Sequence, residues 1–208
     1  MTKLGLCLLM FATDADPLAK QYIPLIRPAG YDYAEVSLSK LYALPKHELF
    51  IYKSMFDSEG IPVEAFNNGV PPGVRLLGGT DLCAQWKSYI ERTLYLADYF
   101  GVSVITSSTP HRFEVPEGFS WEGCGKGQYV EFLRSFAEEC QKHNLQFALE
   151  PICGEEQGFV STLAQAGDII ELVGSDNVKI VPHFFHMRME KDDRAALVDL
   201  VSKDRIGH

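Results

Sequence analysis

Short apolar runs recur along the chain, and most are followed by a longer segment whose apolar residues have helical spacing. We predict six buried strands at Lys3–Leu9, Tyr33–Ser39, Pro62–Asn67, Val102–Ser107, Gln146–Ile152 and Lys179–Phe185. Short, nearly continuous apolar runs are typical of parallel strands that are covered on both faces. The alternation of strand and helix therefore predicts an α/β fold with a parallel sheet.

Apolar residues in the segments between these runs lie three or four positions apart, which is the spacing of one helix face. The three clearest stripes are Leu82, Trp86, Tyr89, Thr93, Ala97 and Phe100; Val130, Leu133, Phe136, Ala137 and Cys140; and Leu163, Ala166, Ile170 and Val173. Gly30, Gly60 and Gly101 each stand where a helix is expected to end and a strand to begin. Glycine accepts the left-handed conformation that closes a helix, so these positions support the predicted boundaries.

Repeated strand–helix units form either a doubly wound sheet or a barrel. No GxGxxG follows the first strand, which weakens the dinucleotide-binding form of the doubly wound sheet. A complete eight-fold barrel takes about 250 residues, whereas this chain has 208. We therefore expect residues 1–208 to form a single (β/α)8 TIM-barrel domain, truncated after about six βα units. Most of strand seven, which begins at Arg205–His208, and all of strand eight would be missing.

Composition and charge argue against several functional classes. The net charge of −9 disfavours nucleic-acid binding, which relies on Lys and Arg to displace phosphate counterions. No apolar run approaches the roughly 18 residues of a membrane span, and no small-residue cleavage site follows the apolar start, so we expect neither a membrane segment nor a signal peptide. The five cysteines are scattered and form no CxxC pair, which favours a reducing, cytoplasmic environment.

Active sites of α/β barrels lie at the carboxyl ends of the strands, so polar residues there are the candidates for chemistry. Glu150 ends the apolar run QFALE, where a carboxylate is costly to bury without a cation or hydrogen bonds. His183 and His186 follow the next apolar run, and His208 lies at the predicted seventh strand. One carboxylate and two imidazoles would suit a borderline divalent ion. A salt bridge for Glu150 and packed or solvated histidines are the alternatives.

Three further polar residues have two interpretations each. Glu156 lies in a glycine-containing loop after the fifth strand, where it either faces the site or is solvated. Arg112 follows the fourth strand and either holds a sugar hydroxyl or phosphate or lies at the surface. Glu35 stands in the middle of the second strand, where it is either substrate-facing or structural and needs a polar lumen.

These segments together resemble the xylose isomerase-like TIM-barrel family, which contains sugar phosphate isomerases and epimerases. The resemblance runs through nearly the whole chain. It rests on the order and spacing of YDYAEVSLS, FNNGVPPGVRLLG, ITSSTPHRFEVPEGF, FALEP, NVKIVPHFFHMRME and IGH. The pieces at the fifth, sixth and seventh strands are the most informative.

The resemblance implies a divalent-metal site. In the family, a Glu on strand five, an Asp on strand six, a His on strand seven and a Glu on strand eight bind the metal, usually Mn, Mg, Co or Zn. Glu150 and His208 match the first and the third of these, and His183 stands where the family has Asp. His186 and Glu156 match residues that contact the substrate. The resemblance also makes a homodimer an expectation, because homodimers are common in the family.

Two departures from the family pattern change the expected chemistry. His183 replaces an Asp and follows Pro182, which removes a ladder hydrogen bond. The strand-eight Glu has no counterpart, because the chain ends at His208. Glu150 with two neutral imidazoles is a less anionic ligand set than three carboxylates, and imidazole suits Zn and Co better than Mg or Mn. We therefore expect a divalent cofactor of Zn, Co or Mn, with Mg less favoured.

The leading functional hypothesis is a metal-dependent isomerase or epimerase that moves protons in a small sugar or keto-sugar through an enediolate. The metal would polarise the carbonyl and its neighbouring hydroxyl. Glu150 would take the proton, with Glu156 and His186 as further catalytic residues that, together with Arg112, orient the substrate. Since the second family carboxylate has no counterpart, we expect weak or no activity. The alternatives are a phosphodiester hydrolase of the kind that repairs abasic DNA and a non-catalytic sugar-binding relative.

Overall fold

The computed structural model describes residues 3–79, 81–108 and 115–208. Its centre is a six-stranded parallel sheet in the order β1-β2-β3-β4-β5-β6, which confirms the predicted barrel-like α/β fold. The strands are β1 Gly5–Cys7, β2 Tyr33–Ser37, β3 Val63–Asn67, β4 Val104–Ser108, β5 Gln146–Glu150 and β6 Val178–Ile180. Each strand pairs with the next one along the chain.

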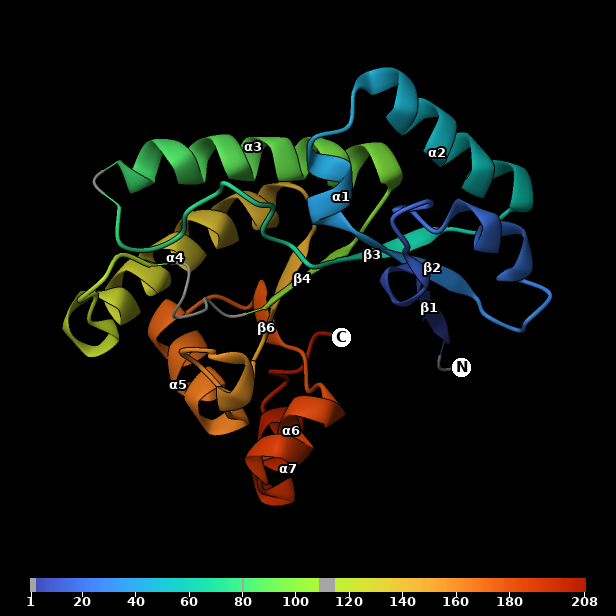
Figure 1. Cartoon of the computed structure of the whole chain (residues 1–208). Helices are drawn as coiled ribbons and strands as arrows, with labels where there is room; N and C mark the ends of the chain where they lie inside the picture. The colour runs from blue at the N-terminus through green and yellow to red at the C-terminus, as the bar shows by residue number, and fades with distance from the viewer. Residues whose placement is uncertain (1–2, 80, 109–114) are drawn as a thin grey trace.

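Helices follow one another around the outer side of the curved sheet (Figure 1). They are α1 Leu38–Tyr42, α2 Lys46–Glu59, α3 Leu82–Phe100, α4 Lys126–Lys142, α5 Leu163–Val173, α6 Phe184–Glu190 and α7 Arg194–Ser202. Shorter 3₁₀ segments are η1 Leu8–Phe11, η2 Lys20–Leu25 and η5 Gly154–Glu156, and η4 Trp121–Gly125 is a π-helical turn. Within the described ranges, none of the helices is long and apolar enough to cross a membrane.

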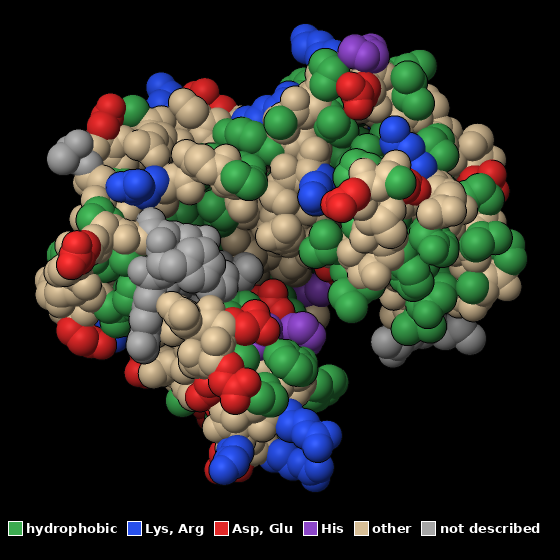
Figure 2. Space-filling view, in the orientation of Figure 1, with side chains coloured by type: hydrophobic (Ala, Val, Ile, Leu, Met, Phe, Trp, Pro, Cys, Tyr) green, Lys and Arg blue, Asp and Glu red, His purple; other side chains and the backbone are tan. Residues whose placement is uncertain are grey.

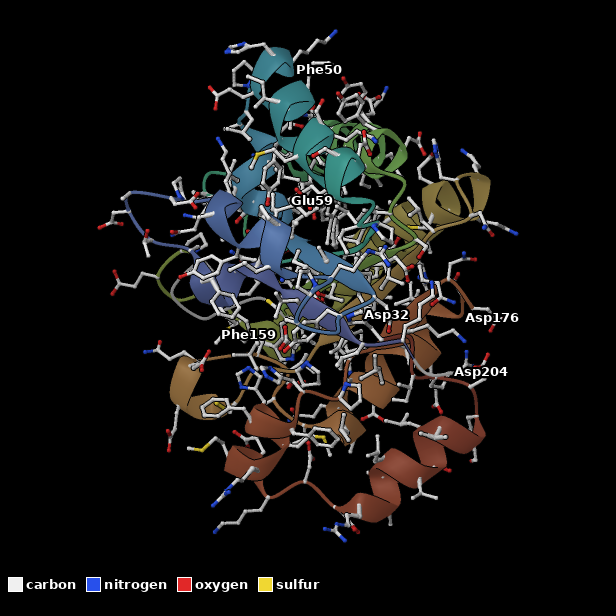
Figure 3. All side chains as sticks on the ribbon, turned by 90° about the vertical axis from the view of Figure 1, so that its right-hand side faces the viewer. Asp32, Phe50, Glu59, Phe159, Asp176 and Asp204 are labelled. Atoms are coloured by element: carbon white, nitrogen blue, oxygen red, sulfur yellow. The ribbon has the colours of Figure 1, made fainter. Side chains whose placement is uncertain are left out.

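All carboxyl ends of the strands face one side of the molecule because every pairing is parallel. Figure 3 shows this polarity directly. Asp32 and Asp176, which precede β2 and β6, lie on one side, whereas Phe159, in the loop after β5, lies on the other. Polar residues at the carboxyl ends of different strands are therefore brought to the same face, as the sequence predicts for a barrel.

The core between the helices and the sheet is largely aromatic. Tyr89 of α3 lies edge-on to Phe136 of α4 with ring centroids 5.8 Å apart, and Phe136 lies 4.9 Å from Phe147 of β5. All three side chains are buried, and burying each contributes about 1.5–3 kcal/mol. The predicted apolar stripes of α3, α4 and α5 are confirmed, since their members are buried. This packing joins α3 and α4 to β5.

Predicted helix ends at two glycines are also confirmed. Gly60 and Gly101 follow α2 and α3 with φ of 64° and 77°, in the left-handed region that glycine tolerates best. Their placement fixes where β3 and β4 start.

The predicted strand Lys179–Phe185 is wrong beyond Ile180. β6 ends there, and Phe184 begins α6 with His183 as its N-cap residue. Pro182 has no N–H to donate to a neighbouring strand, and the N–H of His183 turns back to the carbonyl of Val181 at 3.1 Å. The first predicted strand is likewise shorter, because η1 replaces its end.

The predicted start of a seventh strand forms a single parallel bridge, Ile180 to Ile206. The N–H of Ile180 donates to the carbonyl of Arg205 at 2.9 Å, and the N–H of Gly207 donates to the carbonyl of Ile180 at 3.1 Å. A Cβ on Gly207 would lie 2.5 Å from the Cβ of Lys179, so only glycine fits this approach without a shift. The segment therefore runs along β6, and the chain end lies near the centre of the view in Figure 1.

Two buried tyrosines provide a test of this packing. The hydroxyl of Tyr89 donates to the carbonyl of Gly69 at 2.9 Å, whereas the hydroxyl of Tyr129 has no partner among the described residues. Burial raises the pKa of both hydroxyls, so both are neutral at pH 7. We expect Tyr89→Phe to lower the free energy of unfolding by about 1 kcal/mol and Tyr129→Phe to leave it unchanged or raise it. Urea denaturation of both variants checks this, and equal losses would contradict it.

Candidate functional site

Glu150 is the central residue of the candidate site. It ends β5, and its side chain is 21% exposed. Its Oε1 lies 2.5 Å from Nδ1 of His183 and 3.8 Å from Nε2 of His186. A strand-end carboxylate needs such partners because leaving it partly buried and unpaired is costly. Among the described residues, the partners of Glu150 are two imidazoles and not the Lys or Arg of the alternative interpretation.

Both imidazoles come from the start of α6. His183 is the N-cap residue and His186 lies three positions later, so the two side chains project from the same side of the first turn. Their ring centroids are 4.8 Å apart and the rings are nearly perpendicular, at 87°. His186 is buried, with 6% exposure, and Phe185 lies edge-on to it at 5.2 Å. The early end of β6 thus brings both histidines to Glu150.

The ligand atoms of Glu150, His183 and His186 all lie within 4.8 Å of one another. Bonds of about 2.0–2.2 Å to N and O ligands place the atoms of a tetrahedral site about 3.4 Å apart. Oε1 of Glu150 lies 2.5 Å from Nδ1 of His183 and 3.8 Å from Nε2 of His186, on either side of that value. Small side-chain rotations would therefore accommodate an ion. The 2.5 Å contact is a hydrogen bond, whose proton a cation would replace. The residues present fit a divalent ion.

Cys153 is a neighbour of this group that sequence reasoning missed. Its Sγ lies 3.3 Å from Nδ1 of His186, and its N–H donates to the same nitrogen at 3.4 Å. Cys153, Glu156 and His186 form a second group whose ligand atoms lie within 4.8 Å of one another. The only signal in the sequence was the position of Cys153, three residues after Glu150 in the loop after β5. His186 thus faces Glu150 with one nitrogen and Cys153 with the other.

His208 lies with Glu35 rather than with Glu150. Its Nε2 is 3.0 Å from Oε2 of Glu35, whose Oε1 accepts a hydrogen bond of 2.6 Å from Nδ2 of Asn67. Nδ2 of Asn67 also lies 3.0 Å from Sγ of Cys7. His208, Asn67 and Cys7, from the chain end, β3 and β1, form the polar surroundings that a carboxylate in the middle of β2 requires. The structure therefore places two of the three predicted metal ligands together, and the third apart from them.

Two of the three predicted substrate contacts lie near each other. His186 lies beside Glu150, and Glu156 lies in the exposed 3₁₀ segment η5, close to Cys153 and His186. Arg112 lies outside the described residues. Figure 2 shows histidine and acidic side chains next to each other at the centre of one face, beside the notch between the C-terminal helices and the N-terminal strands.

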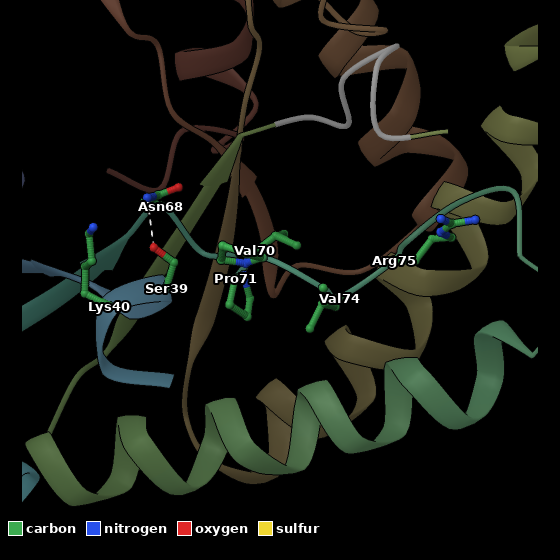
Figure 4. A pocket seen from close by; sticks show the side chains of 9 residues that line it. Ser39, Lys40, Asn68, Val70, Pro71, Val74 and Arg75 are labelled. Carbon is green, nitrogen blue, oxygen red and sulfur yellow. Dashed lines mark hydrogen bonds between the residues drawn. The ribbon is translucent and has the colours of Figure 1, made fainter. Parts of the chain in front are cut away.

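A separate pocket of about 660 Å³ lies at the carboxyl ends of β2 and β3. Ser39 and Asn68 line it and are hydrogen-bonded to each other at 2.9 Å. Figure 4 shows Lys40 and Arg75 at opposite ends of this row of residues, with apolar side chains between them. None of the residues of the Glu150 group lines it. Residues of the segment FNNGVPPGVRLLG therefore line a hollow that the Glu150 group does not share.

Comparison with known proteins identifies relatives over most of the chain. A family model described as "Xylose isomerase-like TIM barrel" matches residues 23–208. An "Inosose isomerase" of Bacillus velezensis is 29% identical over 177 residues, which cover 80% of this chain and 58% of the relative. A "Probable ketose 3-epimerase" of Synechocystis sp. is 26% identical over 172 residues, which cover 79% of this chain and 56% of the relative. The chain therefore spans a little over half the length of these curated relatives.

Solved structures show the same fold. A D-psicose 3-epimerase crystallised in the presence of D-fructose superposes with a TM-score of 0.82 at 20% identity, covering 100% of this chain and 72% of that one. A 3-keto-D-glucoside 4-epimerase from E. coli, in its apo form, gives a TM-score of 0.75 at 22% identity, covering 100% and 78%. At these identities the likeness concerns the fold alone.

The loop after β5 has a glycine that packs against the backbone of Ile152, the residue before Cys153. A Cβ on Gly158 would lie 2.3 Å from the backbone carbonyl oxygen of Ile152, so the loop would have to shift. We expect Gly158→Ala to lower the free energy of unfolding by about 1–3 kcal/mol. Gly127→Ala in α4 is the control, because its Cβ meets nothing within 4 Å and alanine favours the helix. Thermal denaturation compares them, and an unchanged stability of Gly158→Ala would contradict the observed loop packing.

Proposed function

This chain belongs to the xylose isomerase-like TIM barrel family, and on that premise we propose that it is a metal-dependent isomerase or epimerase of a small sugar or keto-sugar. The observation that carries the proposal is the convergence of Glu150, His183 and His186 at the ends of β5 and β6. The relatives named as inosose isomerase and ketose 3-epimerase support the same class of reaction.

We propose that Glu150 and His183 hold the divalent ion, with His208 as the third predicted ligand. Zn, Co or Mn suits this mixed carboxylate and imidazole set better than Mg does. Nε2 of His208 lies 3.0 Å from Oε2 of Glu35, so ligation by His208 would require its imidazole to leave that contact. When bound, the ion polarises the carbonyl and an adjacent hydroxyl of the substrate.

Glu150 is the proposed general base. Its side chain is 21% exposed, so a substrate carbon can approach the carboxylate. It takes the proton from the carbon next to the carbonyl, which leaves an enediolate. A proton returned to the neighbouring carbon gives the isomer, and a proton returned to the same carbon from the opposite face gives the epimer. His186 presents Nε2 beside Glu150 and is proposed to orient the substrate hydroxyls together with Glu156 and Arg112.

The remaining sequence-based expectations belong to the same proposal. Residues 1–208 would act as a single domain, in a reducing, cytoplasmic environment, on a small-molecule substrate without nucleic acid or a membrane as partner. A homodimer is part of this expectation.

Metal content is the first test of the proposed site. Purified protein is expected to hold Zn, Co or Mn, and Glu150→Gln is expected to weaken its affinity for that metal at least about tenfold, because the central oxygen ligand is lost. Glu155→Gln, a neighbouring exposed carboxylate outside both ligand groups, is the matched control and should retain the metal. Elemental analysis and competition with a chelator measure both. Equal metal binding by the two variants would refute the role of Glu150.

Proton exchange is the second test, and it needs only the first proton transfer. In deuterium oxide, the metal-loaded protein is expected to introduce deuterium at the carbon next to the carbonyl of a ketose or an inosose. Glu150→Gln should slow this exchange by about 10²–10⁴-fold. NMR of the sugar follows the exchange. Binding of the sugar without any exchange would instead indicate a non-catalytic sugar-binding relative.

A further inference from the structure

We propose that Cys153, His186 and Glu156 form a second cation site, which takes a thiophilic divalent ion such as Zn²⁺. Their Sγ, imidazole nitrogen and carboxylate oxygen lie within 4.8 Å of one another. The site uses Nδ1 of His186, whereas the Glu150 group faces Nε2 of the same ring. One imidazole therefore separates two ligand groups of different chemistry.

The separation of sulfur and nitrogen fits a shared metal ion. Bonds of about 2.3 Å to sulfur and about 2.1 Å to nitrogen place these atoms about 3.5 Å apart in a tetrahedral site. Sγ of Cys153 lies 3.3 Å from Nδ1 of His186. A cation could therefore take the place of the thiol proton with little movement of either side chain.

The nitrogen that faces Cys153 carries its lone pair on that side. The backbone N–H of Cys153 approaches Nδ1 at 3.4 Å, and a backbone N–H can only donate. Nδ1 is therefore the unprotonated nitrogen, which is the form that binds metals. The bond is long, so a cation can replace it without a large loss.

The loop holds the thiol in place and leaves one side open. Cys153 is 1% exposed, its carbonyl accepts the N–H of Glu156 at 2.9 Å, and the N–H of Ile152 donates to Val160 at 3.0 Å. Glu156 is exposed, so its carboxylate can reach an arriving ion and water can complete the coordination. Thiolate sulfur, imidazole nitrogen and carboxylate oxygen are each ligands that zinc takes in proteins.

The two groups should differ in metal preference. Thiolate selects zinc and other thiophilic ions, whereas the carboxylate and imidazoles around Glu150 also accept Mn. An ion on Nδ1 would also fix the proton of His186 on Nε2, where it faces Glu150 and the proposed substrate. This last consequence rests on the proposed function, whereas the existence of the thiolate site does not.

Cobalt titration tests the site, because thiolate ligation of Co²⁺ gives a charge-transfer band in the near ultraviolet that oxygen and nitrogen ligands do not give. We expect the band in the wild-type chain, in Glu150→Gln and in Cys83→Ser, which removes an exposed cysteine. Cys153→Ser should lose the band while the visible bands from Co²⁺ at the Glu150 group remain. Glu156→Gln should weaken the cobalt affinity of the band about tenfold.

Three outcomes would overturn the proposal. They are the absence of the band in the wild-type chain at saturating Co²⁺, its persistence in Cys153→Ser, and an unchanged affinity in Glu156→Gln. Circular dichroism checks that Cys153→Ser folds, and the exposed Glu156→Gln variant provides the test if it does not. If the near-ultraviolet band is missing while the visible Co²⁺ bands are intact, only the Cys153 site is refuted. If Glu150→Gln leaves the visible absorption unchanged, only the proposed function is contradicted.

Discussion

A carboxylate at the end of a buried strand must find compensating partners, and Glu150 finds two imidazoles from the next βα unit. Its Oε1 lies 2.5 Å from His183 and 3.8 Å from His186. Parallel pairing of β5 with β6 puts the strand end and the start of α6 on the same face. The aromatic packing of α3, α4 and β5 holds that strand from behind. The candidate site depends on this contact, because the other ligand atoms are arranged around it.

Much of the architecture could be predicted from the sequence. Apolar runs and helical stripes located all six strands and the main helices, because burial imposes their spacing on the chain. The pattern did not show where β6 ends, since VPHFF reads as a continued strand. Pro182 and the turn at His183 decide that boundary, and the resulting helix start is what brings His186 to Glu150.

The candidate ligands could be predicted in type but not in grouping. Glu150 and His183 were expected together and lie together, whereas His208 lies against Glu35, a contact between residues 173 positions apart. Cys153 could not be predicted, because a single cysteine in a loop has no pattern and its meaning comes from the 3.3 Å contact with His186. Local spacing places a residue at a strand end, and only packing decides which side chains meet there.

The most direct test of the central claim is the anomalous scattering of crystals grown with Mn²⁺, which the thiolate group should not favour. The account predicts one strong peak about 2.0–2.3 Å from a carboxylate oxygen of Glu150 and from a nitrogen of His183. Absence of a peak at Glu150, with Mn²⁺ found elsewhere in the molecule, would contradict a metal-dependent site at the ends of β5 and β6.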